Sequence, residues 1–182
     1  TPMTVQLPAP LAKAAGQPLP VRFEMRPLAS GTAANDAGDL DEVLLQIGNV
    51  ASARYEQRTT ANGTEVLRGG IGVHQPVPQP AEGVLASLAL EHLDIDAWRQ
   101  VFTAPVTEKD TAPAAEHAAD HGAAYLPSHV AARAQTLRIL GRDFNAVSVD
   151  ASRDGRNWQS TIDSREIAGT SRWRAESAAV PL

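Results

Sequence analysis

The sequence predicts a mainly β protein (α+β), in which an antiparallel β meander forms a curved sheet whose edges can stay open, with one short helix packed on or beside it. Two observations carry this prediction. Apolar residues alternate with polar ones through much of the chain, which is the period of a strand with one buried face. Glycine, asparagine and proline interrupt these runs at short intervals, as they do at turns between strands.

The first fifty residues contain an arm and the first two predicted strands. Residues 1–20 are rich in proline and alanine and carry little periodic apolar surface, so we expect an irregular N-terminal arm before a single β-rich domain over 21–182. The stretch 28–41 is rich in glycine, alanine and aspartate and predicts a loop between the two strands. The alternating apolar positions of these strands are Val21, Phe23, Met25, Val43, Leu45 and Ile47.

Two hairpin signals and a pair of glycines mark the next strands. Gly48-Asn49 predicts a turn, and Asn62-Gly63 is the strongest two-residue hairpin signal in the sequence because both residue types tolerate a positive φ. We therefore expect strands over 50–58 and 65–73. The adjacent Gly69-Gly70 indicates a β-bulge or the close approach of another segment of backbone.

A proline-rich connection leads to the predicted centre of the sheet. Prolines occupy every second position from 76 to 80, and their missing N–H groups prevent a continuous strand within 74–82. The run 84–90 that follows is apolar on one face and partly apolar on the other. Because that pattern is typical of a strand covered on both faces, we expect a central strand here.

The period changes to that of a helix at one place. Ile95, Trp98 and Phe102 have the spacing of a single helix face. Asp94 can accept hydrogen bonds from the free N–H groups of the first turn, so a short helix is expected over 94–102. The same carboxylate suits the positive end of the helix dipole, and this structural role explains it without a catalytic one.

The alanine-rich stretch 107–127 has almost no large apolar residue, so we expect a flexible loop with a turn or two of helix. Within it His117 and His121 are four apart, a spacing that can hold a metal ion on a helix. Glu116 and Asp120 are next to them. No further ligand spacing is present, and a solvated loop explains the same polar residues, so no metal site and no cofactor is expected.

Residues 136–173 are predicted to form four short strands in an antiparallel meander. Gly141 and Gly155 stand at two of the breaks, where glycine can take the positive φ of a tight turn. The strand between these turns alternates strictly, with polar residues on its second face. The apolar positions of the first three of these strands are Leu137, Ile139, Val147, Val149, Trp158 and Ile162.

The sequence around one predicted turn of this meander resembles a calcium-binding loop. Asp150, Ser152 and Asp154 precede Gly155 with the spacing of the first half of such a loop. The twelfth position would be Thr161 instead of a bidentate glutamate, so the second half fails. An Asp-Gly hairpin explains the same residues.

Composition excludes several classes of function. Sixteen Lys and Arg against 21 Asp and Glu give a net charge of −5, which argues against a nucleic-acid partner. There is no cysteine, so disulfides and thiolate metal sites are excluded. No apolar run approaches the roughly 20 residues that span a bilayer, so no membrane insertion is expected within this segment. No serine elbow, oriented histidine or isolated carboxylate pair indicates an enzyme.

Three motifs, in order along the chain, resemble one known family. Leu137 to Trp158 reads Leu-x-Ile-x-Gly-Arg-x-Phe-x-x-Val-x-Val-x-Ala-Ser-Arg-x-Gly-x-x-Trp and is followed by Ile-Ala-Gly-Thr-Ser-Arg-Trp at 167–173. Upstream are Leu-Asp-Ile-Asp-Ala-Trp at 93–98 and the weaker Val-Leu-Arg-Gly-Gly-Ile at 66–71. Together they resemble the YhdP branch of the AsmA-like envelope proteins over the latter two thirds of the chain; the first third matches only in strand rhythm.

The resemblance implies a location and a function. AsmA-like proteins stack such β units into a long, open, curved sheet with an apolar concave face, are anchored in the inner membrane of Gram-negative bacteria, and cross the periplasm. They are thought to carry phospholipid between the inner and outer membranes. The chain would then be a periplasmic segment of a larger, membrane-anchored repeat protein, and phospholipid its partner.

On this reading the apolar strand positions become candidates for a lipid groove. Trp158 and Ile162 are the foremost candidates if their face is open. The full candidate set is Val43, Leu45, Ile47, Leu137, Ile139, Val147, Val149, Trp158 and Ile162.

Two alternatives stay open at the level of sequence. The same strands could close into a structural or protein-interaction module of the envelope that has no contact with lipid, in which an exposed edge or the proline-rich arm binds envelope protein partners. A carbohydrate-binding domain would need tyrosines or tryptophans aligned on one surface, and Tyr55, Tyr125 and the three tryptophans are dispersed in the sequence. An uncovered apolar face favours lipid, and complete coverage favours the structural role.

Overall fold

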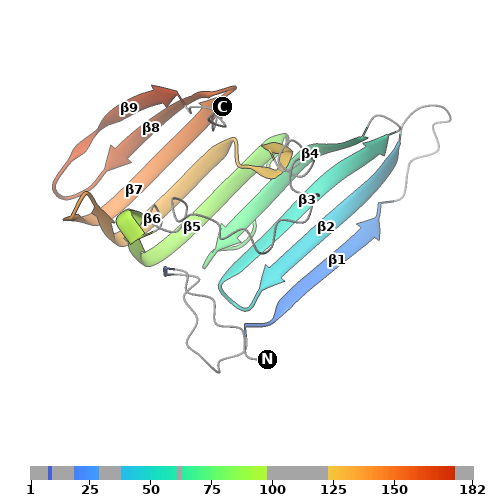
Figure 1. Ribbon diagram of the computed structural model, residues 1–182, viewed down its shortest axis with the longest axis horizontal. Coiled ribbons are helices and arrows are strands. Elements are labelled where there is room, and N and C mark those ends of the chain that lie inside the picture. The colour runs from blue at the N-terminus through green and yellow to red at the C-terminus, as the bar shows by residue number, and fades with distance from the viewer. Residues whose placement is uncertain (1–7, 10–18, 29–37, 61–62, 98–122, 175–182) are drawn as a thin grey trace, which may run out of the picture.

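Nine strands form one open sheet in which spatial order follows chain order from β1 to β9 (Figure 1). The computed structural model describes residues 8–9, 19–28, 38–60, 63–97 and 123–174. The strands are β1 Val21–Pro27, β2 Asp39–Ile47, β3 Ala51–Thr60, β4 Gly63–Val73, β5 Gly83–Asp94, β6 His129–Ile139, β7 Arg142–Asp154, β8 Asn157–Asp163 and β9 Ala168–Arg174; a single 3₁₀ turn, η1, spans Ala123–Tyr125. The predicted fold class, mainly β with a curved open sheet, is confirmed.

The sheet is a mixture of two antiparallel halves around a parallel centre. Strands β1 to β4 and strands β6 to β9 pair antiparallel, as the predicted meander requires. Strand β5 pairs parallel with both β4 and β6, so the three central strands run in the same direction. The predicted central strand is therefore the fifth of nine.

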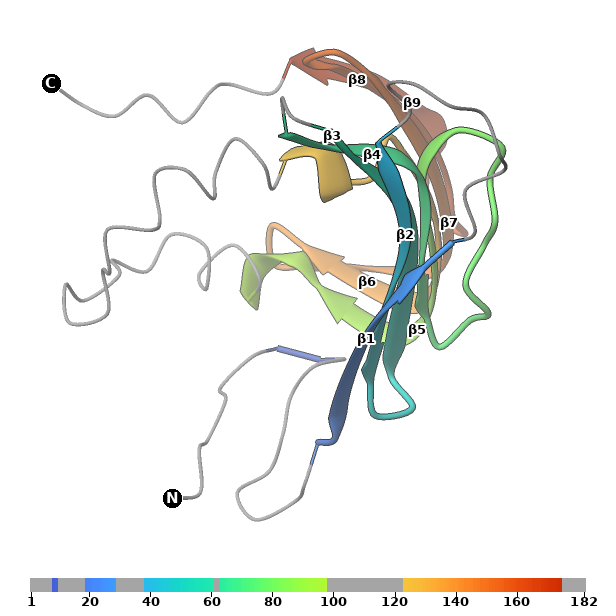
Figure 2. The ribbon, with the colours of Figure 1, turned by 90° about the vertical axis from the view of Figure 1, so that its right-hand side faces the viewer.

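The strands bend around one hollow side of the sheet. Figure 2 looks along the long axis of the molecule and shows η1 on the concave side and the β4–β5 connection on the convex side. Tyr55 contacts Tyr125 of η1, so residues that share a face with Tyr55 point to the concave side. Gly70 lies against Pro78 of the connection, so residues that share its face point to the convex side.

The β4–β5 connection packs directly on strand backbone. A side chain at Gly70 would place its Cβ 1.9 Å from the carbonyl oxygen of Pro78, and one at Gly72 would place it 2.4 Å from that of Gln75. The predicted close approach of backbone at the glycine pair is confirmed. The register between β3 and β4 also shifts by one residue between Glu56 and Gln57, which is a β-bulge.

The end of β5 is tied to the β6–β7 turn. The Asp96 carboxylate accepts hydrogen bonds from the backbone N–H groups of Leu140 and Gly141 at 2.9 and 2.8 Å, which fixes a turn whose two residues both have positive φ. The Asp94 carboxylate accepts one from the Ala97 N–H at 2.8 Å, as expected of the predicted cap. Residues 95–97 are helical, and the rest of the predicted helix lies outside the described residues.

The buried apolar residues of the sheet all point to the concave side. They are Val43, Ala53, Val84, Ala86, Leu90, Val147 and Ala151. The convex face instead carries cross-strand ion pairs, which join Arg54 to Glu42 on β3 and β2 and Arg68 to Glu56 on β4 and β3. The two faces therefore differ in polarity, with the apolar one turned inward.

Candidate functional site on the concave face

Two apolar rows cross all nine strands on the concave face. Residues directly opposite each other in neighbouring strands point to the same side of a sheet, so the register defines the rows. The first row is Phe23, Leu45, Ala53, Ile71, Ala86, Val130, Ala151, Ser160 and Ser171, and the second is Val21, Ile47, Ala51, Val73, Leu88, Ala132, Val149, Ile162 and Gly169. We call these two rows the apolar trough. Neighbouring strands are about 4.8 Å apart, so the eight intervals of the trough extend roughly 38 Å.

The polar side chains within the trough satisfy each other. Ser160 and Ser171 are the two polar members of the rows, and their hydroxyl oxygens are 2.9 Å apart in a hydrogen bond. This bond uses one of the two hydroxyl hydrogens, so the serines are paired with each other but remain the most polar part of the trough, at β8 and β9. Many of the other members are alanine, glycine or valine, whose short side chains leave space above the backbone.

Seven of the nine predicted groove residues lie on the concave face. Leu45, Ile47, Val149 and Ile162 are members of the trough. Three others share its face in flanking rows: Val43 is opposite Tyr55, Val147 is opposite Ala134, and Trp158 is opposite Arg153.

The prediction for Leu137 and Ile139 is wrong. The concave positions of β6 are Val130, Ala132 and Ala134, and alternation along the strand points Leu137 and Ile139 to the opposite face. Leu137 is instead opposite Leu93 and Phe144. Apolar and polar residues alternate over 136–139, but this alternation does not show on which face of the sheet the apolar residues lie. The face depends on the register with the neighbouring strands.

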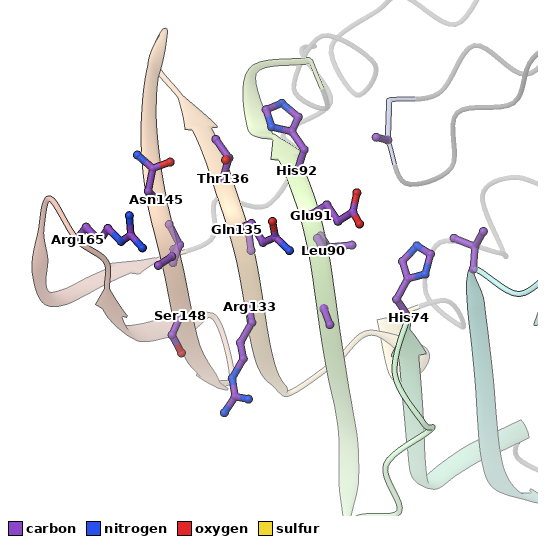
Figure 3. A pocket seen from close by; sticks show the side chains of 16 residues that line it. His74, Leu90, Glu91, His92, Arg133, Gln135, Thr136, Asn145, Ser148 and Arg165 are labelled. Carbon is purple, nitrogen blue, oxygen red and sulfur yellow. The ribbon is translucent and has the colours of Figure 1, made fainter.

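A large hollow opens where β4 has ended and β5 continues. Strand β4 ends at Val73, opposite Leu88, so among the described residues no strand lies on that side of the last six residues of β5. The hollow measures about 1180 Å³. Figure 3 shows its labelled side chains, which come from β5, β6, β7, the end of β4 and the β8–β9 loop. Its lining combines apolar Leu90 and Val147 with polar His92 and Thr136.

Two tyrosines hold η1 against the concave face. The rings of Tyr55 and Tyr125 meet edge to face with centroids 5.1 Å apart. The Tyr125 hydroxyl donates to the Gln57 side-chain oxygen at 2.6 Å, and the Tyr55 hydroxyl donates to the Tyr125 carbonyl at 3.2 Å. Burial, and secondarily the Tyr125 phenol, raises the pKa of Tyr55 above its usual 10.0. The Tyr55 phenol therefore stays protonated at neutral pH, and its hydrogen bond to the Tyr125 carbonyl helps to hold η1 against the sheet.

Two tryptophans stack at one corner of the same face. The rings of Trp158 on β8 and Trp173 on β9 are parallel within 4°, with centroids 5.8 Å apart. The Arg153 guanidinium lies 5.8 Å from the Trp158 ring centroid. The three residues are directly opposite one another in register. Aromatic residues that are dispersed in the sequence thus meet in two pairs, these tryptophans and the tyrosines, and Trp98 lies outside the described residues.

The structure offers no metal centre in the part of the chain it describes. No three His, Cys, Asp or Glu side chains among the described residues are grouped as ion ligands. His117 and His121 lie outside the described residues. At the calcium-like sequence, Asp150 pairs with His129 at 3.1 Å and Gly155 takes a φ of 57° in the hairpin turn, as the hairpin prediction requires. No helix in the described part is both long and apolar enough to span a bilayer.

Comparison with known proteins assigns the family. The sequence pattern of a family described as YhdP protein matches residues 1–182. The chain belongs to the YhdP family. This confirms the resemblance carried by the three motifs, and membership of the YhdP family suggests an envelope protein with a role related to lipid transport. No curated protein and no solved structure matches the chain.

Proposed function

We propose that this YhdP-family segment passively conducts phospholipid between the inner and outer membranes, with the acyl chains lying in the apolar trough. The observation that supports the proposal is the trough itself, which crosses nine strands without an unpaired polar side chain. The parent protein would be anchored in the inner membrane and this segment would lie in the periplasm. No bond is made or broken, so the proposal needs no catalytic group and no cofactor.

The physical basis is the cost of exposing hydrocarbon to water. Each methylene group moved out of water gains about 0.8 kcal/mol, so an acyl chain with about 14 methylenes gains about 11 kcal/mol when it is covered. A trough that covers the chain at every point along its path removes most of this barrier. An open side lets the polar head group stay in water while the chain moves.

Cross-linking in cells tests the proposal with face-matched positions. A photoreactive amino acid at Ile162 would lie in the trough, whereas one at Leu137 would lie on the opposite face. A second pair, Leu45 in the trough and its chain neighbour Leu44 on the convex face, repeats the comparison at the other end of the sheet. In the full-length parent protein we expect phospholipid adducts at Ile162 and Leu45, detected by mass spectrometry, and few at Leu137 and Leu44. Equal labelling of both faces, or no lipid on either, would refute the proposal.

A second candidate function has support at the edge of the sheet. No strand of the described ranges pairs with the outer side of β1, and its trough-facing residues Val21 and Phe23 are 64% and 61% exposed. Such an edge can take another strand, as in an interaction module of the envelope. Protein adducts at Phe23 together with an absence of lipid adducts at Ile162 would favour this function over lipid conduction.

A further inference from the structure

The two ends of the apolar trough differ in polarity. Ser160 on β8 and Ser171 on β9 are directly opposite each other in the first row, and their Oγ atoms are 2.9 Å apart. The other end of the same row is Phe23 on β1, which is 61% exposed. A cargo that has a polar and an apolar part therefore meets hydroxyl groups at one end of the trough and hydrocarbon at the other.

The two serines differ in exposure, and this difference assigns the donor of their hydrogen bond. Ser160 is 6% exposed, whereas Ser171 on β9 is exposed. Each hydroxyl carries one hydrogen, and the bond between them uses one of the two. Donation from Ser160 to Ser171 leaves no buried hydrogen without an acceptor, so this arrangement is favoured. The Ser171 hydrogen then points into the trough, and a hydroxyl that accepts one hydrogen bond donates a stronger one.

Two indole rings border the serines on the same face. Trp158 precedes Ser160 by one alternation on β8, and Trp173 follows Ser171 by one alternation on β9. The two rings are stacked, and Trp173 is 47% exposed. Indoles favour the boundary between hydrocarbon and water, where the glycerol ester region of a phospholipid also lies. This end of the trough therefore suits the ester region better than it suits the end of an acyl chain.

The rest of the trough next to the serines suits the acyl chain itself. From Ser160 the first row continues through Ala151 on β7, Val130 on β6 and Ala86 on β5, which are small and apolar. The hydrocarbon core of a bilayer is about 30 Å thick, so one acyl chain covers about 15 Å of it. Three strand spacings of about 4.8 Å cover nearly the same length. An acyl chain that begins at the serines therefore ends near β5.

We propose that Ser171, supported by Ser160, donates a hydrogen bond to an ester carbonyl of a phospholipid whose acyl chains lie along the trough toward β1. This inference rests on the proposed function and adds to it a position for the glycerol ester region and an orientation for the lipid. The carbonyl oxygen is the acceptor, and a chain that is linked to glycerol by an ether lacks it. The serine pair therefore distinguishes ester-linked from ether-linked lipid with the same head group.

A competition between these two kinds of lipid tests the inference on the full 182-residue chain. The protein is incubated with vesicles that contain equal amounts of phosphatidylcholine with ester-linked chains and phosphatidylcholine with ether-linked chains of the same length. It is then separated from the vesicles, and the bound lipid is counted by mass spectrometry. The test variant is Ser160→Ala with Ser171→Ala. The control variant is Thr161→Val with Thr170→Val, which removes the neighbouring pair of hydroxyls from the opposite face of the same two strands.

We expect the wild-type chain and the control variant to hold about fivefold more ester-linked than ether-linked lipid, the factor that corresponds to one net hydrogen bond. In the test variant the two lipids are bound equally, whereas the total lipid bound does not fall, because alanine makes the trough more apolar. If circular dichroism shows that the double variant loses its sheet, Ser171→Ala alone, at an exposed position, carries the same expectation.

Three results overturn the inference alone: a wild-type chain that binds both lipids equally, a test variant that keeps the preference, and an equal loss of preference in the test and control variants. The absence of bound lipid in the wild-type chain overturns the proposed function as well.

Discussion

At Gly70 the sheet has no room for a side chain, and this leads to a stability prediction. The Gly70→Ala substitution would place a methyl group 1.9 Å from the Pro78 carbonyl oxygen, so the connection must move away from the sheet. We expect the free energy of unfolding to fall by about 1 to 3 kcal/mol, measured by denaturant unfolding. Gly169→Ala is the matched control, because a Cβ there meets nothing within 4 Å, and we expect it to be neutral or to stabilise by up to about 1 kcal/mol. Equal effects at both positions would contradict this account.

Individual side chains also show where sequence reasoning reaches its limit. The positive φ at Gly48 and Gly155 follows from glycine in a turn signal, and both are observed. Leu140, by contrast, has a φ of 52° although it is not glycine, and the sequence gives no sign of this. Its conformation is held by the Asp96 carboxylate, which is 44 residues away. Such a constraint depends on tertiary structure and has no local pattern.

Among the elements, the β8–β9 loop has a pH-dependent anchor. The Glu166 carboxylate accepts hydrogen bonds from the side-chain amide and the backbone N–H of Asn145, both at 2.8 Å. These bonds lower the pKa of Glu166 below its usual 4.5. Because the folded state favours the ionised form, the stabilisation is present above pH 4.5 and is lost as the pH falls through the lowered pKa.

This anchor can be measured by hydrogen exchange. We expect the amides of β9 to exchange faster as the pH is lowered below about 4.5, after correction for intrinsic exchange rates, because the loop is released. The Glu166→Gln variant should show that faster exchange already at neutral pH, with little further change on acidification. Glu82, an acidic residue outside this loop, provides a control through Glu82→Gln, which should leave the exchange of β9 unchanged. An acid response in the Glu166→Gln variant equal to that of the wild type would argue against the anchor.

Most elements could be predicted from the sequence, but their pairing at the centre could not. Alternation and turn residues identify β1, β2 and the four strands of the last third, because each is bounded by a local signal. The parallel pairing of β5 joins it to strands on both sides without a tight turn, so no local turn signal indicates it. Connections without periodic apolar residues carry no information about the side on which they return, so a meander was the simpler expectation.

At the scale of the whole molecule, the proposed conduction of lipid predicts that a bulky residue in the trough blocks the movement of acyl chains. Ala132 lies in the trough on β6, and its chain neighbour Ala131 lies on the opposite face, where it is opposite Asp150. We expect Ala132→Phe in the parent protein to reduce the yield of lipid adducts at Ile162 severalfold, because the ring fills space that an acyl chain would use. Ala131→Phe should leave the yield unchanged. Circular dichroism of both variants checks that the sheet is retained, and equal yields with the sheet intact would contradict the account.

The trough could be predicted from the sequence only in part, and for a reason that involves the whole sheet. Strict alternation identified Leu45, Val149 and Ile162 as inward-facing, and the register confirms a shared face. The same alternation misplaced Leu137, because a period of two leaves open which of the two faces is concave. The aromatic pairs were missed for a similar reason. Trp158 and Trp173 are equally far from the β8–β9 loop, and their contact follows only once that hairpin is recognised.

Because every strand contributes a single residue to each row, the length of the apolar trough and its width are independent of each other. Inserting one further hairpin in register would lengthen the path by about 9.6 Å, two strand spacings, without altering its cross-section. The width of the trough depends instead on the size of the side chains in its two rows. If the trough conducts lipid as proposed, a lineage could adapt such a protein to a wider or narrower gap between two membranes by duplicating hairpins, without changing which lipid fits.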